Sequence, residues 1–484
     1  MAILKSEKYI YFMALAASLG SCTSGLFFTI FNAAQIELEK AFSEKIPEGI
    51  EALFQSFIPL GGLIGGIFSG LLADNFGRRV GLIIVDVLTI IGCILTVVTS
   101  TPIIPLFLLG RFICGLTVGF NWTIVTLFIR EISPVNLSGR TGSFFMLSFA
   151  FGILLSYLIS LLLPQDHPKG ELWRLLFIFP AVISILRLFI FIFVITFDTP
   201  KFYILQNNNA AAQRVLTKIY KEEYVASIYE KEKKAAKRTD FREYFKGKFK
   251  KQFNLACMLI IIFQLTGINL VTFYSSKMFF HSSTDIDETN DVKVFNLAIG
   301  SIRVLCALFA GYLADKIGRR MLFIVGIISM TMILFLLGLF GQLERHMGVK
   351  VLLLLYLIAN GFTFATILPV YMAEILPLSG CGYAVSFENF TVFVVIYSFP
   401  FLVKLVGLYP VFYFCFAAGI AGLIYVWLRV KETKGKKDIE IYNEFNVDGA
   451  DYGLLDEDMI ETLSSQGLSL VERKEENLIA QAMN

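Results

Sequence analysis

The chain has 484 residues, of which 56% are hydrophobic, 14% are aromatic and only 17% are charged. So few charged residues do not suit a surface that faces water, which makes lipid the expected solvent for much of the molecule. The formal net charge of +3 is small, and the basic residues are spread between apolar runs instead of forming one patch. This composition favours a membrane protein and excludes a nucleic-acid partner.

Apolar segments follow one another along the chain in two groups of six. A helix needs about 20 apolar residues to cross the hydrocarbon core of a bilayer. Segments near this length cover residues 9–31, 54–72, 80–98, 103–127, 144–163 and 173–195, and then residues 255–279, 294–313, 321–339, 349–372, 383–403 and 408–428. The sequence therefore predicts an all-α membrane protein with twelve transmembrane helices in two six-helix bundles.

A polar, basic segment separates the two groups, and its pattern suits amphipathic helices at a membrane surface. The loops that carry Arg78 and Arg79, and Arg319 and Arg320, fall on the same side if the helices alternate. Loops rich in Lys and Arg face the cytoplasm. We therefore predict that both termini are cytoplasmic, with four parts in order: an N-terminal bundle (1–197), a cytoplasmic linker (198–252), a C-terminal bundle (253–430) and a polar tail (431–484).

An internal repeat relates the two groups of helices. The stretch from Gly70 to Arg79 is identical at seven of ten positions to the stretch from Gly311 to Arg320. A shorter match pairs Glu131-Ile-Ser-Pro with Glu374-Ile-Leu-Pro. Two related halves of this kind usually enclose a binding site at their interface, near the middle of the membrane.

Several motifs occur in a fixed order along the chain. They are Asp74-x-x-Gly-Arg-Arg, Gly110-Arg-Phe, Glu131-Ile-Ser-Pro, Asp198-Thr-Pro-Lys, Gln264-Leu-Thr-Gly-Ile-Asn, Asp315-x-x-Gly-Arg-Arg, Pro369-Val-Tyr-Met-Ala-Glu and Glu432-Thr-Lys-Gly. With them the chain resembles the sugar porters, the hexose transporters of the major facilitator superfamily, from about residue 25 to residue 435. The resemblance implies the major facilitator fold and transport by alternating access.

The resemblance also assigns a role to the loop motifs. A carboxylate beside guanidinium groups forms charge-assisted, bidentate hydrogen bonds that join helix ends. In the family such clusters close the cytoplasmic side, which implies a gate latch of two matched groups: Asp74, Arg78, Arg79 and Glu131, and Asp315, Arg319, Arg320 and Glu374. The alternative is that the arginines serve only as positive anchors on the cytoplasmic side.

A neutral, hydroxyl-rich solute needs neutral donors and acceptors in an apolar pocket, because bare charges are costly at mid-membrane. Gln264 and Asn269 on the predicted seventh helix meet that need, and we expect them to orient the solute. Thr272, Tyr274 and Asn32 are secondary candidates, which could equally bond a neighbouring helix.

The chain departs from the sugar porters at positions that bear on the solute. Phe263 and Met146 stand where relatives carry glutamine, and Arg303 stands on the eighth helix where many relatives carry asparagine. A cation so deep cannot easily reach either membrane surface, so it must face a cavity or a partner. Arg303 is therefore either a member of a buried ion pair or a substrate-facing group that binds a carboxylate or phosphate.

Four other charged residues lie within the predicted helices: Asp86, Arg111, Arg187 and Glu388. We assign Arg111 to structural pairing, with Asp86 as a candidate partner, and Arg187 to a buried ion pair or to anion recognition. Proton-coupled relatives carry a carboxylate on the first helix where this chain has Phe27, which argues against proton symport by that route. Glu388 would substitute if it faced the cavity, but the sequence does not show which way it points.

Together these features imply a carrier that passes a hexose or a related small polar solute down its gradient, as a monomer in the plasma membrane. No Ser/His/Asp arrangement and no phosphate-binding glycine loop is visible, so we expect no enzymatic activity, cofactor or metal. Two alternatives stay open. One is a transporter of an organic anion or sugar phosphate that uses Arg303, and the other is a sugar sensor that does not transport.

Overall fold

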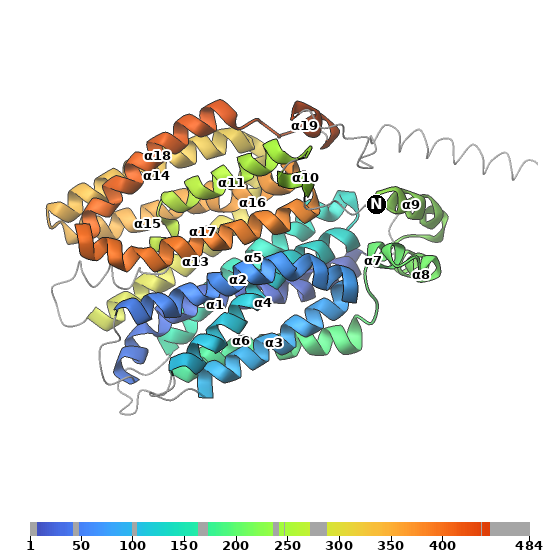
Figure 1. The fold of residues 1–484 in the computed structure, drawn as a ribbon, viewed down its shortest axis with the longest axis horizontal. Helices are drawn as coiled ribbons and strands as arrows, with labels where there is room; N and C mark the ends of the chain where they lie inside the picture. The colour runs from blue at the N-terminus through green and yellow to red at the C-terminus, as the bar shows by residue number, and fades with distance from the viewer. Residues whose placement is uncertain are drawn as a thin grey trace, which may run out of the picture.

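The structure is a computed structural model that describes residues 7–41, 48–98, 104–162, 173–235, 242–245, 247–271, 288–436 and 438–445. These residues are almost entirely helical (Figure 1). Within the described part, 11 helices are long and apolar enough to cross a membrane. The expected seventh span, residues 255–279, extends beyond the described residues, and its first part is the helix α11.

The first half of the chain forms one bundle of long helices. They are α1 (Glu7–Ala41), α2 (Glu48–Phe76), α3 (Arg78–Val98), α4 (Ile104–Ile132), α5 (Val135–Leu162) and α6 (Trp173–Phe189). A short π-helix, η1 (Ile190–Val194), extends the end of α6. Because α4 packs against α1, α2 and α3, and α3 also packs against α6, the helices close into a single unit.

The second half repeats this arrangement. Its helices are α11 (Lys250–Leu265), α13 (Glu288–Ile317), α14 (Arg319–Gln342), α15 (His346–Phe362), α16 (Phe364–Ile375), α17 (Leu378–Val406) and α18 (Leu408–Arg429). α15 and α16 form one membrane span with a break at Thr363. The two halves meet where α2 packs along α17 and α5 packs along α13 (Figure 1).

Apolar residues face outward as well as inward, as expected for helices whose surroundings are lipid. On α6 the exposed apolar side chains recur every three or four residues, at Leu175, Ile178, Val182, Ile185 and Phe189. The opposite face of α6 buries Ser184 and Arg187 against the rest of the bundle. The polar side of such a helix is therefore its protein side.

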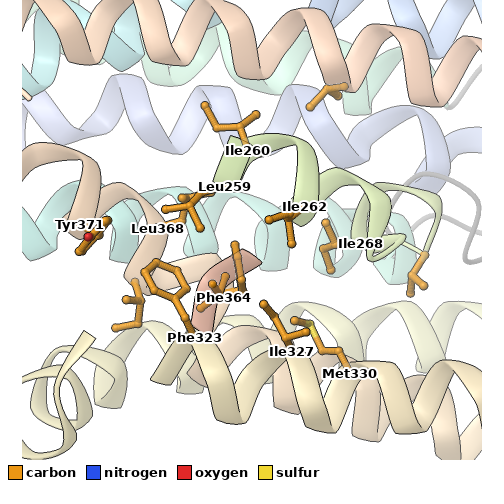
Figure 2. Close-up of a cluster of buried hydrophobic side chains, with 14 of the residues drawn as sticks. Leu259, Ile260, Ile262, Ile268, Phe323, Ile327, Met330, Phe364, Leu368 and Tyr371 are labelled. Carbon is orange, nitrogen blue, oxygen red and sulfur yellow. The ribbon is translucent and has the colours of Figure 1, made fainter. Parts of the chain in front are cut away.

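A continuous apolar core fixes the position of α11 in the second half (Figure 2). Leu259 and Ile262 of α11 belong to the same buried cluster as Phe323 of α14 and Phe364 of α16. The rings of Phe323 and Phe364 lie 4.7 Å apart between centroids. This packing holds the end of α11, where the predicted solute-binding residues begin.

Short helices connect the halves on one side of the molecule. They are α7 (Pro200–Leu205), α8 (Asn209–Ile219), α9 (Glu222–Ala235) and α10 (Arg242–Phe245), with α19 (Asp438–Glu444) after the last long helix. Figure 1 shows α7, α8, α9 and α19 gathered at the same end of the bundle. The described part of the predicted linker contains these short helices.

Candidate functional site

A cavity of about 120 Å³ lies between the two halves of the chain. The first half contributes mainly apolar and aromatic side chains, among them Phe28, Met146 and Phe149. The polar groups on the wall come mostly from the second half: Asn269, Arg303, Thr366, Glu388 and Asn389, with the indole of Trp122 from the first half. A mainly apolar cavity with a few polar groups is the usual form of a small-molecule site.

Asn269 reaches the cavity because the seventh helix is interrupted beside it. α11 ends at Leu265, and Gly267 then takes a φ of 84°, which turns the chain. The Nδ2 of Asn269 donates a hydrogen bond to the Oε1 of Gln264. Gln264 is only 2% exposed and does not line the cavity, so in this structure its side chain orients the amide of Asn269.

Arg303 of α13 and Glu388 of α17 both line the cavity. The electrostatic neighbours of Arg303 include the hydroxyls of Tyr157 and Tyr356. In the described part of the chain the carboxylate of Glu388 makes no ion pair and accepts no side-chain hydrogen bond. The cavity thus holds one cation and one anion on separate helices that do not form an ion pair with each other.

The two residues that replace family glutamines are both on the cavity wall. Met146 and Phe263 line it, and the ring of Phe263 stacks on that of Phe364, with centroids 5.4 Å apart and an interplanar angle of 6°. On the opposite side the rings of Trp122 and Phe149 meet edge to face at 5.4 Å. A thioether and an aromatic ring therefore stand on this wall where relatives carry amides.

The secondary candidates contribute less. Asn32 does not line the cavity, and its Nδ2 donates to the hydroxyl of Tyr157 at 3.3 Å, which joins α1 to α5. Thr272 and Tyr274 lie outside the described residues. Sequence reasoning missed Asn389, Thr366 and Trp122. The signal for them is that each lies at or beside polar residues within a long apolar segment, as Trp122 does between Asn121 and Thr123.

A buried ion pair lies inside the first half, away from the cavity. Nε of Arg187 donates to both carboxylate oxygens of Asp86, at 2.9 and 3.0 Å, and Nη2 lies 2.7 Å from Oδ1. Nη1 of Arg187 donates to Oδ1 of Asn121 at 2.9 Å. Both partners of the pair are at most 1% exposed. Arg187 is therefore committed to Asp86, and its proposed use in anion recognition is wrong.

The predicted pairing of Arg111 with Asp86 is also wrong. Arg111 is buried on α4, where its Nε donates to the carbonyl of Phe54 at 3.0 Å. Its guanidinium lies over the rings of Phe31 and Phe177, at 5.8 and 5.9 Å from the centroids. Cation–π contacts and one carbonyl, rather than a carboxylate, hold this charge.

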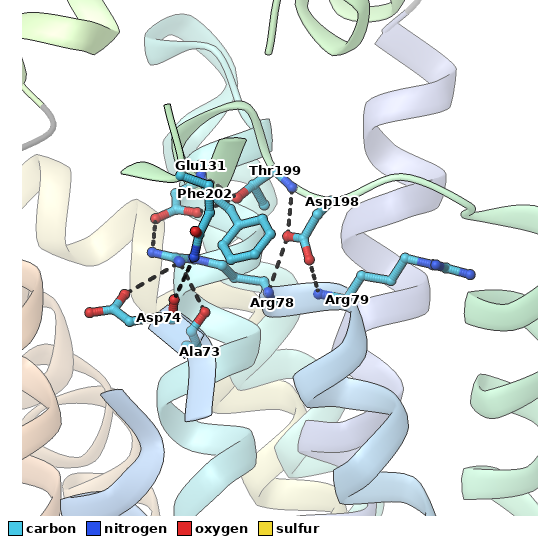
Figure 3. A network of polar contacts seen from close by, with 9 residues as sticks. Ala73, Asp74, Arg78, Arg79, Glu131, Asp198, Thr199 and Phe202 are labelled. Atoms are coloured by element: carbon cyan, nitrogen blue, oxygen red, sulfur yellow. Dashed lines mark hydrogen bonds and ion pairs between the residues drawn. The ribbon is translucent and has the colours of Figure 1, made fainter. Parts of the chain in front are cut away.

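The first latch cluster joins the ends of α2, α3 and α4 (Figure 3). Nη2 of Arg78 donates to Oε1 of Glu131 at 2.9 Å, and Nη1 lies 3.4 Å from Oδ1 of Asp74. The other carboxylate oxygen of Glu131 accepts a 2.6 Å hydrogen bond from the hydroxyl of Thr199. The side chain of Arg78 is only 3% exposed, so the centre of this cluster is buried between the helix ends and not on the solvent surface.

The second half repeats the same cluster. Nη2 and Nε of Arg319 donate to Oε1 of Glu374 at 2.8 and 3.1 Å. The hydroxyl of Thr433 donates to Oε2 of Glu374 at 2.6 Å, as Thr199 does to its glutamate. The side chain of Asp315, the predicted counterpart of Asp74, lies outside the described residues.

The second arginine of each motif does something other than predicted. Nε of Arg79 donates to the carbonyls of Phe191 and Ile195 at the end of the sixth helix, at 2.9 and 2.7 Å. Nη2 of Arg320 donates to the carbonyl of Trp427 near the end of α18. Neither arginine binds a latch carboxylate in the described structure. Both instead satisfy the free carbonyls at a helix C-terminus.

Asp198 and Glu432, which sequence reasoning left without a role, complete the two clusters. The carboxylate of Asp198 accepts hydrogen bonds from the backbone N–H groups of Arg78 and Arg79, at 3.1 and 2.9 Å. The carboxylate of Glu432 accepts from those of Arg319 and Arg320, at 2.8 and 3.1 Å. Each caps the N-terminus of a long helix, where a negative charge is favoured.

The glycine of each motif makes this cap possible. Gly77 and Gly318 have φ of 92° and 101°. A Cβ on Gly77 would lie 2.2 Å from Oδ2 of Asp198, and one on Gly318 would lie 2.7 Å from Oε2 of Glu432. The motif glycines therefore provide both the backbone conformation and the room for the capping carboxylate.

The two capping carboxylates differ in their surroundings. Burial raises the pKa of Asp198, and the backbone N–H groups of Thr199, Arg79 and Arg78 only partly oppose it. At the more exposed Glu432, burial acts in the same direction, but the N–H groups of Lys434, Arg319, Arg320 and Thr433 together outweigh it and lower the pKa. The ion pairs of Arg78 with Glu131 and of Arg319 with Glu374 each lie within one half, so each of these pairs ties helices of a single bundle together.

Two bundles of membrane-spanning helices around a cavity at their interface define a secondary transporter. The family described as Sugar (and other) transporter matches residues 13–445 of this chain, and the chain belongs to that family within the major facilitator superfamily. Its fold and its two matched latch clusters agree with this assignment.

Among its relatives is the glucose transporter GlcP of Staphylococcus epidermidis, which is 27% identical over 459 residues, or 91% of this chain and 98% of the relative. The facilitated glucose transporter protein 1 of Caenorhabditis elegans is 30% identical over 415 residues, covering 81% and 79%. The xylose transporter XylE from E. coli, in a partially occluded inward-open conformation, superposes with a TM-score of 0.77 at 22% identity, covering 89% and 100%. The last likeness confirms the twelve-helix major facilitator fold.

Proposed function

We propose that the protein carries a hexose or a closely related neutral polyhydroxy solute across the membrane by alternating access. The observation that carries the proposal is the cavity between the two halves, with the amides of Asn269 and Asn389 on a wall that is otherwise largely apolar and aromatic. Relatives named as glucose transporters support the same class of solute.

The geometry suggests how the solute is held. Amide groups donate to and accept from sugar hydroxyls, and the ring faces of Trp122 and Phe263 pack against the C–H faces of the sugar. Gln264 fixes the direction of the Asn269 amide. Movement of one half against the other, along α2 with α17 and α5 with α13, would then open the cavity to one side at a time.

Counterflow tests this function without any imposed gradient. Proteoliposomes loaded with unlabelled glucose should take up labelled glucose faster than protein-free vesicles. Asn269→Ala should raise the KM about tenfold, because one or two hydrogen bonds to the solute are lost, each about 1 kcal/mol. Gln342→Ala is the control, since Gln342 is exposed beside Tyr413 at the outer end of α14. No counterflow from folded wild-type protein, or an unchanged KM in Asn269→Ala, would contradict the proposal.

A second candidate solute is an organic anion or sugar phosphate, and the placement of Arg303 on the cavity wall favours it. Arg303→Asn separates the two solutes, because it removes the charge and restores the residue that many sugar porters carry. If glucose counterflow survives or improves while uptake of glucose 6-phosphate disappears, the solute is anionic. Loss of folded protein would instead assign Arg303 to the structure. Folded protein without any flux would favour a sugar sensor.

We also propose that both termini face the cytoplasm, that the protein resides in the plasma membrane and that it acts as a monomer. Basic residues of the linker helices support the orientation, because Lys-rich and Arg-rich segments stay inside. Antibody access to terminal tags in intact cells tests the orientation. Microscopy of a tagged protein tests the membrane, and the mass of the protein in native nanodiscs tests the monomer.

A further inference from the structure

We propose that Glu388 carries a proton through the transport cycle, so that solute movement is coupled to proton movement in the same direction. This proposal rests on the function proposed above and adds its energy source. It is carried by the position of the carboxylate: Glu388 lies on the wall of the central cavity, within the membrane-spanning part of α17, with no ion pair in the described part of the chain.

The comparison with Asp86 shows how unusual this position is. Asp86 also lies within a membrane span, but it is 0% exposed and is bound by Arg187 through Nε and Nη2. In the described part of the chain no cation contacts the Glu388 side chain in this way. The backbone carbonyl of Glu388 accepts a hydrogen bond from Oγ1 of Thr391 at 2.7 Å. A bare carboxylate at mid-membrane costs several kcal/mol, a cost that a bound proton removes. The cavity gives such a proton access to Glu388.

Among the charged groups on the described cavity wall, Glu388 is the carboxylate that can accept a proton. Arg303 and the thiol of Cys306, both on α13, share the cavity wall with it. Arg303 makes no ion pair with Glu388 and stays positive in both protonation states of the glutamate. On α2, α4, α11, α16 and α18, which pack against α17, the charged groups toward the same end as the latches are Asp74, Arg130, Glu131, Lys250, Lys251, Glu374 and Arg429. On the other side of mid-membrane lie Glu51 and Arg111.

Glu388 also lies beside the contact along which the halves move. The neighbouring Asn389 and Ser386 fit against glycines of α2: a Cβ on Gly62 would lie 2.5 Å from Oδ1 of Asn389, and one on Gly66 would lie 2.4 Å from Oγ of Ser386. These contacts join the first half to the second. A change of charge on Glu388 therefore acts next to the surface that rearranges, where it can bias the equilibrium between states.

The cycle needs no other reactant. In the outward-open state the Glu388 carboxylate takes one proton from the outside water, and the solute binds. After the halves rock, the cavity opens to the cytoplasm, the solute leaves and the neutral carboxyl returns its proton to the inside water. The empty, charged carrier then turns back. One proton crosses with each solute molecule, and no bond other than the O–H bond forms or breaks.

Steady-state accumulation in proteoliposomes tests the proposal, because it measures energy coupling and not rate. With one proton per solute, a pH gradient of one unit, alkaline inside, supports up to about tenfold accumulation of labelled glucose. We expect the wild type to accumulate glucose severalfold, and external glucose to acidify the lumen, as read by a trapped pH dye. Glu388→Gln should accumulate glucose only to the equilibrium level, whatever its counterflow rate.

Two variants complete the experiment. Glu344→Gln, an exposed glutamate at the outer end of α14, should accumulate glucose as the wild type does. Glu388→Asp keeps a titratable group and should retain accumulation. If Glu388→Gln fails to fold, the proposal is still tested by lumen acidification in the wild type and by glucose accumulation in Glu388→Asp. Counterflow without accumulation or acidification in the wild type overturns the proton proposal and leaves the hexose function standing. Accumulation that persists in Glu388→Gln also overturns it. Absence of wild-type counterflow defeats the hexose function instead.

Discussion

Removal of the carboxylate from the buried Asp86–Arg187 pair should destabilise the first half strongly. The three contacts of the pair measure between 2.7 and 3.0 Å, and neither side chain is more than 1% exposed. In Asp86→Leu the guanidinium stays buried without its counter-charge, which costs about 3–5 kcal/mol in other proteins. The expected loss in free energy of unfolding for Asp86→Leu is therefore about 3–5 kcal/mol.

The double variant Asp86→Leu/Arg187→Met tests whether this loss in free energy of unfolding comes from the unpaired guanidinium. It removes both charges, and the main loss that remains is the hydrogen bond from Arg187 to Asn121, worth about 1–2 kcal/mol. An exposed pair supplies the control: Lys436 and Glu444 form an ion pair with side chains 31% and 33% exposed. Glu444→Gln should cost at most about 1 kcal/mol, because water screens such pairs.

Unfolding in mixed micelles, followed by tryptophan fluorescence as the fraction of SDS rises, measures all of these free energies. The reasoning fails if Asp86→Leu costs no more than Glu444→Gln. It also fails if Asp86→Leu/Arg187→Met costs as much as Asp86→Leu and Arg187→Met added together, because two residues that do not interact give additive effects.

Three further changes have expected outcomes. Gly77→Ala should lower the melting temperature more than Gly435→Ala, because both glycines have positive φ but only a Cβ on Gly77 meets Oδ2 of Asp198, at 2.2 Å; equal melting temperatures would contradict this. The pKa of Glu432 is lowered in the folded protein from its ordinary value of 4.5, so its cap stabilises above that pH and is lost as the pH falls further. The difference in melting temperature between wild type and Glu432→Gln should thus shrink on acidification below about pH 4.5, and a difference that grows would refute the sign. Phe263→Gln places an amide on the cavity wall and should lower the counterflow KM for glucose about fivefold, the effect of one added hydrogen bond of about 1 kcal/mol; a higher KM in folded protein would argue against a sugar at this wall.

The helices could be predicted because the bilayer imposes their length on the sequence, whatever their neighbours are. The partners of buried charges could not. Asp86 lies on α3, which packs against both α4 and α6, so Arg111 and Arg187 were both possible partners. Which of them reaches Asp86 depends on the rotation of each helix about its axis, and a single sequence of nearly all-round apolar helices does not specify that rotation.

The functional site was predicted in part, for a similar reason. Asn269 was identified from its motif, and the structure places it on the cavity wall. Gln264 was predicted to share its task, but a turn at Gly267 leaves it behind Asn269. The roles of Asp198 and Glu432 were hidden because their partners are backbone N–H groups, which every sequence contains. The glycines before each arginine pair were the available clue.

The confinement of each latch to its own half has a consequence for how the chain could be divided. Asp198 and Thr199 tie the start of the linker to the first bundle, and Tyr244 near the end of the linker packs on Tyr383 of the second. A cut between Ala235 and Arg242 would sever none of these ties. Two separately synthesised fragments would each keep these contacts, and would meet along α2 with α17 and α5 with α13, the surfaces between the two halves.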